Sequence, residues 1–224
     1  MPSYAIARTA APPVLDRGWD DPAWNAAAAL AVDRFHPKSA STHPVTRARL
    51  LHDGEALYGV FRVEDRWVRS VTTAFMGPVC TDSCVELFIE PAPGRGYVNL
   101  EMNAGGTLHA SHVVDPTRRP EGGFADWTPF APEDGGRVRI CSSLPAVVEP
   151  EIEEPVTWTL AFAVPFAVLE RYVGAVRPVG GAAWRANLYK CGDRTSHPHW
   201  ATWAPIDECN FHAPQHFAKL QFAE

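Results

Sequence analysis

The chain has 224 residues and a formal net charge of −6 at pH 7. This acidic balance argues against nucleic acid and anionic membrane surfaces as partners, because both select for basic patches. The sequence contains no run of 18 apolar residues and no apolar core of a secretory signal near its first residues. We therefore expect a cytoplasmic protein for the sequence as given, or an extracellular or periplasmic one if a signal has been removed.

The predicted elements are mostly short strands. Residues 1–13 are predicted as an extended N-terminal arm and residues 14–224 as a single domain, in which the alanine-rich run 25–31 favours a short helix. Alternating apolar and polar residues then predict strands at 46–52, 56–64, 83–90, 97–103, 138–142, 156–164, 183–191, 200–204 and 218–222.

The remaining segments are predicted as loops, apart from one helix. Pro165 is well placed to start a helix over residues 166–173. The proline- and glycine-rich segment 114–135 and the acidic segment 143–155 are predicted as loops. This pattern predicts an all-β fold, an antiparallel β-sandwich of jelly-roll or immunoglobulin-like type with one short helix.

Strand alternation also predicts a polar face. If Val98, Leu100 and Met102 point into the core, their neighbours along the strand point to the opposite face. Three strands then place on that face Glu86, Asn99, Glu101, Asn103, Arg185 and Asn187. Such side chains can read the hydroxyl pattern of a ligand, because they combine hydrogen-bond donors and acceptors. In the alternative interpretation, Arg185 pairs across strands with Glu86 or Glu101 on a solvated sheet.

The five cysteines and the histidines leave other chemistry open. The odd cysteine count and irregular spacing indicate reduced thiols. Cys191, His197 and His199 offer metal-ligating atoms, but their spacing matches neither the CxxC nor the HxxxH pattern of zinc sites. A nucleophilic cysteine paired with histidine is formally available at Cys191. Glu86 and Glu101 on neighbouring strands could also form the carboxylate pair of a glycoside hydrolase.

An ordered series of motifs then carries a resemblance. The series comprises Asp21-Pro22-Ala23-Trp24, LLHDGEALYGVFRVED (50–65), DSCVELFIEP (82–91), YVNLEMNAGGT (97–107), WRANLYK (184–190) and FHAPQHFAKLQF (211–222). Over residues 14–222 the sequence resembles the family 9 carbohydrate-binding modules and their DOMON-like relatives. The resemblance implies a β-sandwich that binds a saccharide, without cleaving it, on a concave polar face rimmed by aromatic rings.

The resemblance also implies roles for individual residues. Glu86 matches the glutamate of the family's DSVEIF-like element, Glu101 matches a cleft-facing strand position, and Phe211 matches one aromatic rim position. The second rim position falls within residues 77–81, where the family has a tryptophan and this sequence has no aromatic residue. A ring from elsewhere, such as Trp67 or Phe75, would then be needed.

Structural calcium is the one ion that the resemblance implies. Asp20, Asp21 and Asp65 are oxygen donors in plausible loops. Some DOMON-like relatives bind haem through methionine and histidine. Apart from Met1, this sequence offers only Met76 and Met102, the latter at an inward strand position.

The function predicted from the sequence is therefore non-catalytic carbohydrate binding, with a role in polysaccharide breakdown by analogy only. The predicted saccharide contacts are Glu86, Asn99, Glu101, Asn103, Arg185, Asn187, Trp203 and Phe211. Two alternatives stay open: a structural or partner-binding β-sandwich with a vestigial cleft, and a haem-binding DOMON-like electron-transfer domain.

Overall fold

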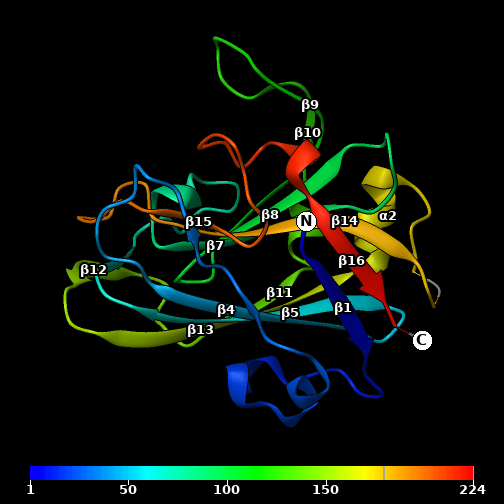
Figure 1. The fold of residues 1–224 in the computed structure, drawn as a ribbon, viewed down its shortest axis with the longest axis horizontal. Coiled ribbons are helices and arrows are strands. Elements are labelled where there is room, and N and C mark those ends of the chain that lie inside the picture. The colour runs from blue at the N-terminus through cyan, green and yellow to red at the C-terminus, as the bar shows by residue number, and fades with distance from the viewer. Residues whose placement is uncertain (179, 224) are drawn as a thin grey trace.

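The computed structural model describes residues 1–178 and 180–223. Its main feature is a curled mixed sheet whose two halves face each other as layers (Figure 1). We call the half that carries the predicted polar face the front layer. In spatial order its strands are β10 (Phe124–Pro129), β9 (Leu108–Arg118), β8 (Tyr97–Asn103), β7 (Cys84–Glu90), β14 (Ala183–Cys191) and β16 (Ala218–Phe222).

The back layer lies opposite, and one strand joins the two halves. In spatial order the back layer comprises β4 (Val45–His52), β5 (Ala56–Asp65), β13 (Val156–Pro165) and β11 (Arg139–Ser142). The joining strand β1 (Ser3–Arg8) pairs in parallel with β16 through its first half and with β4 through its second half. The mostly-β class is confirmed, whereas the prediction of purely antiparallel pairing is wrong because of β1. Jelly-roll or immunoglobulin-like connectivity stays a prediction.

Shorter elements complete the fold. The small strands are β2 (Leu30–Ala31), β3 (Arg34–Phe35), β6 (Val68–Ser70), β12 (Val148–Ile152) and β15 (Trp200–Thr202). The α-helices are α1 (Pro132–Gly135) and α2 (Phe166–Val173), and 3₁₀ turns cover Leu15–Asp20, Pro22–Ala26, Val79–Thr81 and Pro214–His216. In the described part of the chain, no helix has the length and apolarity needed to cross a bilayer.

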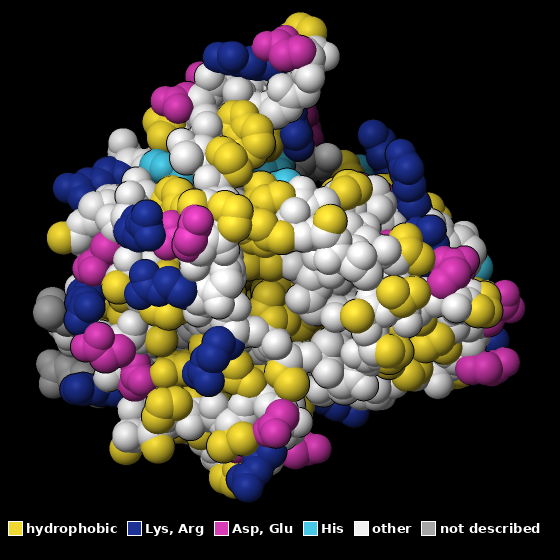
Figure 2. All heavy atoms as spheres, turned by 180° about the vertical axis from the view of Figure 1, so that it is seen from behind, with side chains coloured by type: hydrophobic (Ala, Val, Ile, Leu, Met, Phe, Trp, Pro, Cys, Tyr) yellow, Lys and Arg dark blue, Asp and Glu magenta, His cyan; other side chains and the backbone are white. Residues whose placement is uncertain are grey.

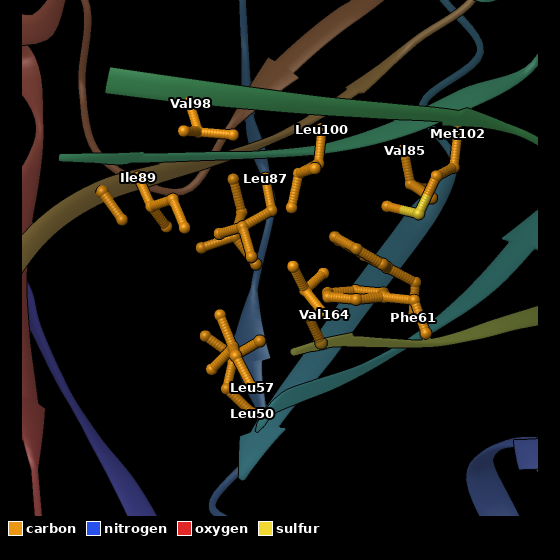
Figure 3. Packing of buried hydrophobic residues seen from close by; sticks show 14 of the residues in the cluster. Leu50, Leu57, Phe61, Val85, Leu87, Ile89, Val98, Leu100, Met102 and Val164 are labelled. Carbon is orange, nitrogen blue, oxygen red and sulfur yellow. The ribbon is translucent and has the colours of Figure 1, made fainter. Parts of the chain in front are cut away.

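The core lies between the two layers, as strand alternation predicts. Apolar side chains from β7 and β8 point down toward Leu50, Leu57, Phe61 and Val164 of the back layer (Figure 3). Val98, Leu100 and Met102 are at most 1% exposed. Because these three side chains face the core, the opposite face of β8 must carry the polar residues of that strand.

Several segments differ from the sequence prediction, among them the predicted N-terminal arm 1–13, which contributes β1 to the sheet. Residues 25–31 are not a helix: Asp21 caps a 3₁₀ turn through the Ala23 amide, and Leu30–Ala31 pairs with β4, so strand pairing overrides the helix propensity of alanine. The predicted loop 114–135 contains β10 and α1, and the predicted loop 143–155 contains β12. The β9–β10 hairpin is the largest omission, and it projects beyond the layers (Figure 1).

The surface is mixed in charge. Seen from behind, basic and acidic side chains are interspersed, and both signs gather on the part that projects from the body (Figure 2). Hydrophobic side chains lie between them over the rest of the view.

Candidate functional site

A pocket of about 320 Å³ opens on the outer face of the front layer. Its floor comes from β7 and β8, which supply Glu86, Asn99 and Glu101. The walls come from the β9–β10 hairpin, from β15 and from three loops. The other lining residues are Pro78, Cys80, His109, Arg118, Phe124, Cys191, Asp193, Trp200, Cys209, Asn210, Phe211 and His212. The volume is at the lower end of the range for small-molecule sites.

Two carboxylic acids dominate the floor. Glu86 and Glu101 lie directly opposite each other in the β7–β8 register and are only 2% and 7% exposed. Burial raises the pKa of Glu86 well above its usual value, and the neighbouring Glu101 raises it further. Burial also raises the pKa of Glu101, although His109 and Asn99 oppose this. The pair therefore keeps a proton to higher pH than free glutamic acid does, so it can both donate and accept hydrogen bonds.

Asn99 fixes the position of Glu101. Its Nδ2 donates to Glu101 Oε1 over 2.6 Å, and its Oδ1 accepts from the backbone amide and hydroxyl of Ser111. Because strands β8 and β9 hold both partners, the Glu101 carboxyl has one preferred orientation in the pocket.

Two aromatic rings at the wall are held in place. Phe211 stacks on Tyr189 with ring centres 4.1 Å apart, and the Tyr189 hydroxyl donates to the Phe211 carbonyl. Since Tyr189 covers one face of Phe211, only the other face can contact a ligand in the pocket. Trp200 donates from Nε1 to Asp193 Oδ1 over 2.7 Å. Such fixed rings suit stacking against an apolar ligand face.

Phe124 provides a third aromatic ring in the pocket wall, and it is buried. Phe124 is 6% exposed and lies under the Arg118 guanidinium, 4.3 Å from its ring centre. Its centre is also 4.5 Å from that of His212. Arg118 is therefore the one residue of this group that presents a charge to the pocket mouth.

The structure brings four of the eight predicted contacts together in this pocket: Glu86, Asn99, Glu101 and Phe211. Arg185 lies outside the lining. It forms an ion pair with Glu90 over 2.8 Å and donates to the Pro214 carbonyl. Arg185 therefore pairs with a glutamate on a neighbouring strand, as the alternative interpretation predicts, but the partner is Glu90 and not Glu86 or Glu101.

The other three predicted contacts are also outside the lining, because the structure uses them as supports. Asn103 donates to the Thr72 carbonyl and to Asp82 Oδ2. Asn187 bonds the backbone of Ala204 through both ends of its amide. Trp203 is 7% exposed within the core cluster. We do not carry Asn103, Arg185, Asn187 or Trp203 into the proposed site.

Trp200 is one of the wall residues that the sequence interpretation missed. It lies three positions before Trp203 in a three-residue strand, and a pattern that short does not decide which ring faces outward. Trp67 and Phe75, the rings considered for the missing rim position, are elsewhere. Trp67 stacks on His197 at 4.2 Å, and Phe75 packs against the core.

The metal and haem hypotheses find little support in the predicted residues. Asp65 is bound inside the protein by Lys190 and Trp158, and Asp21 caps a 3₁₀ turn, so these residues do not fit a shared calcium ion. His199 Nε2 is hydrogen-bonded to Lys190 Nζ over 2.7 Å, and His199 is not among the donors grouped with the Cys191 thiol. Met102 is buried between the layers. In the described ranges, the donor atoms that do come together belong to Cys84, Glu86 and Cys191.

His212 should make the stability of the protein sensitive to acid. Burial and the nearby Arg118 charge lower its pKa to about 3. Below about pH 6.5 the unfolded chain therefore binds a proton that the folded chain rejects until about pH 3, so stability falls with pH across this window. In His212→Gln we expect the free energy of unfolding to fall less steeply with decreasing pH, by up to about 1.4 kcal/mol per pH unit.

Urea unfolding of the wild type and of His212→Gln at pH 7, 6 and 5 checks this expectation. The free-energy difference between the two proteins should shrink as the pH falls. A constant difference across the series would show that His212 titrates normally in the folded state.

Comparisons with known proteins agree with this architecture. The model of carbohydrate-binding family 9 matches residues 23–222. A proposed carbohydrate-binding protein from Bacteroides uniformis is similar in structure, with a TM-score of 0.81, 26% identity and 98% of both chains covered. No protein of curated function matches the sequence.

Two structures of a family 9 carbohydrate-binding module from Caldicellulosiruptor kristjanssonii share the fold. The glucose complex gives a TM-score of 0.64 at 14% identity, covering 97% of this chain and 95% of the module. The cellotriose complex gives 0.66 at 14% identity, covering 99% and 94%. These matches do not support the DOMON-like part of the resemblance. Because the family model spans most of the sequence, this chain is a carbohydrate-binding domain that belongs to carbohydrate-binding family 9.

Proposed function

We propose that the chain binds one end or a short unit of a saccharide in the front-layer pocket, without cleaving it. The observation that carries the proposal is the combination of Glu101 and Asn99 on the floor with the rings of Phe211 and Trp200 at the wall. Hydroxyl groups need paired donors and acceptors, and the apolar face of a sugar ring needs an aromatic surface.

The volume of the pocket and the ligands bound by structurally similar modules indicate which class of saccharide to test. A pocket of about 320 Å³ is bounded at its sides by loops and by the β9–β10 hairpin, which favours a few sugar units over a long chain running across the sheet. The structurally similar module from Caldicellulosiruptor kristjanssonii was solved with glucose and with cellotriose. We propose glucose-based oligosaccharides as the first ligands to test.

Binding without cleavage is favoured over hydrolysis by the arrangement of the two glutamates. A glycoside hydrolase needs one carboxyl group kept protonated and one kept charged. Here burial is the largest influence on both carboxyl groups and raises the pKa of Glu86 and of Glu101, so the charged form is disfavoured at both positions. The partner-binding alternative rests on a filled cleft, and the open pocket speaks against it.

Isothermal calorimetry with glucose, cellotriose and xylo-oligosaccharides tests the proposal. We expect binding by the wild type and by the control Glu64→Gln on the back layer, where Glu64 is 44% exposed on its side chain. Glu101→Ala should lose binding while remaining folded, and no reducing sugar should be released from any substrate. Absence of binding to every saccharide, equal binding by Glu101→Ala, or measurable cleavage would each contradict the proposal.

A further inference from the structure

A group of metal-ligating side chains lies at the base of the pocket and shares Glu86 with the pocket floor. Cys84 and Cys191 lie directly opposite each other on β7 and β14. Glu86 follows Cys84 by two residues, so its side chain points to the same face. All three are at most 2% exposed. The alternation of both strands therefore forces two thiols and a carboxylic acid into one small space.

The distances suit a tetrahedral ion. The donor atoms of Cys84, Glu86 and Cys191 lie within 4.8 Å of one another, and Cys191 Sγ is 3.1 Å from Glu86 Oε1. Zinc bonds of about 2.3 Å to sulfur and about 2.1 Å to oxygen place two sulfurs about 3.8 Å apart and a sulfur and an oxygen about 3.6 Å apart. Small side-chain movements are enough to reach these separations.

The local charge balance also favours a cation. In the part of the chain that the structure describes, no lysine, arginine or histidine donates a hydrogen bond to the side chain of Cys84, Glu86 or Cys191, although Lys190 donates to the backbone carbonyl of Cys191. Two thiols and a carboxylic acid are thus packed together with no positive side chain hydrogen-bonded to them, and a bound divalent ion would stabilise their deprotonated forms.

The site has an entry path and an open side. Glu86 and Cys191 line the pocket, whereas Cys84 lies behind them. Cys80 also lines the pocket, and its carbonyl oxygen accepts from Cys191 Sγ over 3.7 Å. A metal held by the three buried donors would thus keep its fourth position toward the pocket, where water can occupy it.

We propose that Cys84, Cys191 and Glu86 bind a soft divalent cation, with zinc as the best fit, at the base of the pocket. Two thiolates and one carboxylate match the ligand preference of zinc and disfavour calcium and magnesium, which take oxygen ligands. Binding displaces into solvent the protons of both thiols and the proton that the Glu86 carboxyl carries when it is neutral. This inference does not depend on whether the pocket binds sugar.

Metal titration of the reduced full-length protein tests the proposal. With Zn²⁺ we expect one equivalent to bind in calorimetry, and with Cd²⁺ a thiolate-to-metal absorption in the ultraviolet whose intensity corresponds to two thiolates. Cys84→Ser and Cys191→Ser should each weaken binding by about 100-fold or more. Cys141→Ser, which changes a half-buried cysteine packed against the back layer, is the matched control and should bind like the wild type.

The Cd²⁺ absorption is measured on the wild type, so the test holds even if a variant fails to fold. Absence of Zn²⁺ binding to the reduced protein would overturn the proposal, as would a Cd²⁺ signal lacking thiolate character. A serine variant that is folded and keeps full affinity would overturn it as well. An intact mass two hydrogens lighter under reducing conditions, with Cys84 linked to Cys191, would replace the metal site by a disulfide.

Discussion

Lys190→Met should lower the free energy of unfolding by about 3–5 kcal/mol. The Lys190 side chain is fully buried, and its ammonium lies 3.4 Å from Asp65 Oδ2. It also donates to His199 Nε2 over 2.7 Å and to the Cys191 carbonyl over 3.1 Å. Removing the ammonium leaves a buried carboxylate with only neutral partners, and an unpaired buried charge is among the costliest single defects in a protein.

The neutral state of His199 fits this arrangement. Burial and the Lys190 charge lower the pKa of His199 to about 3, so its Nε2 accepts from lysine while Nδ1 donates to the His197 carbonyl. The contacts of Lys190 with Asp65 and His199 thereby link the end of β14 to β5 and to the loop before β15.

Urea unfolding distinguishes a charge effect from a packing effect. The exposed Lys219→Met on β16 is the matched control and should change stability by less than about 0.5 kcal/mol. The double variant Lys190→Met/Asp65→Leu should be more stable than Lys190→Met alone, because it removes the orphaned charge. A double variant that is less stable than the single one would show that Lys190 contributes mainly by packing.

Phe211→Ala should weaken saccharide binding by about 2 kcal/mol, or about 30-fold. Tyr189 stacks on one face of the Phe211 ring, so the ring is already correctly oriented before a ligand binds. A preorganised aromatic surface loses little conformational entropy when it binds, which is why truncation of such anchors is costly.

Calorimetry with the same oligosaccharides measures this loss, with thermal unfolding to show that the variant is folded. Trp19→Ala is the control, since Trp19 is half-buried and packs against a buried apolar group of the back layer that includes Leu51, Tyr58 and Val60. It should leave affinity unchanged. Equal affinities for wild type and Phe211→Ala would remove Phe211 from the site.

The regular part of the fold could be predicted from the sequence because alternation is a local signal. The strands at 97–103, 183–191 and 218–222 and the helix at 166–173 have the predicted bounds. The β9–β10 hairpin was missed because Pro116 and the glycines near its tip mask its strand pattern. The same omission hid Arg118 and Phe124, which form part of the pocket wall.

The site was predictable only to the level of strand faces. Alternation placed Glu86, Asn99 and Glu101 on one face, and all three lie on the pocket floor. It also placed Arg185 and Asn187 on that face, but loops that return from far along the chain take up their hydrogen bonds. Which polar side chain stays available to a ligand is set by these long-range contacts, and a single sequence does not reveal them.

The location of saccharide binding is the central claim, and a ¹H–¹⁵N NMR titration with cellotriose tests it most directly. We predict shifts concentrated at the Trp200 indole, the Asn99 side-chain amide and the Phe211 backbone, with the Trp19 and Trp158 indoles unchanged. Trp158 is fully buried and Trp19 lies beside the back layer. Shifts centred on the back layer, or none at saturating cellotriose and related oligosaccharides, would contradict the assignment of the pocket.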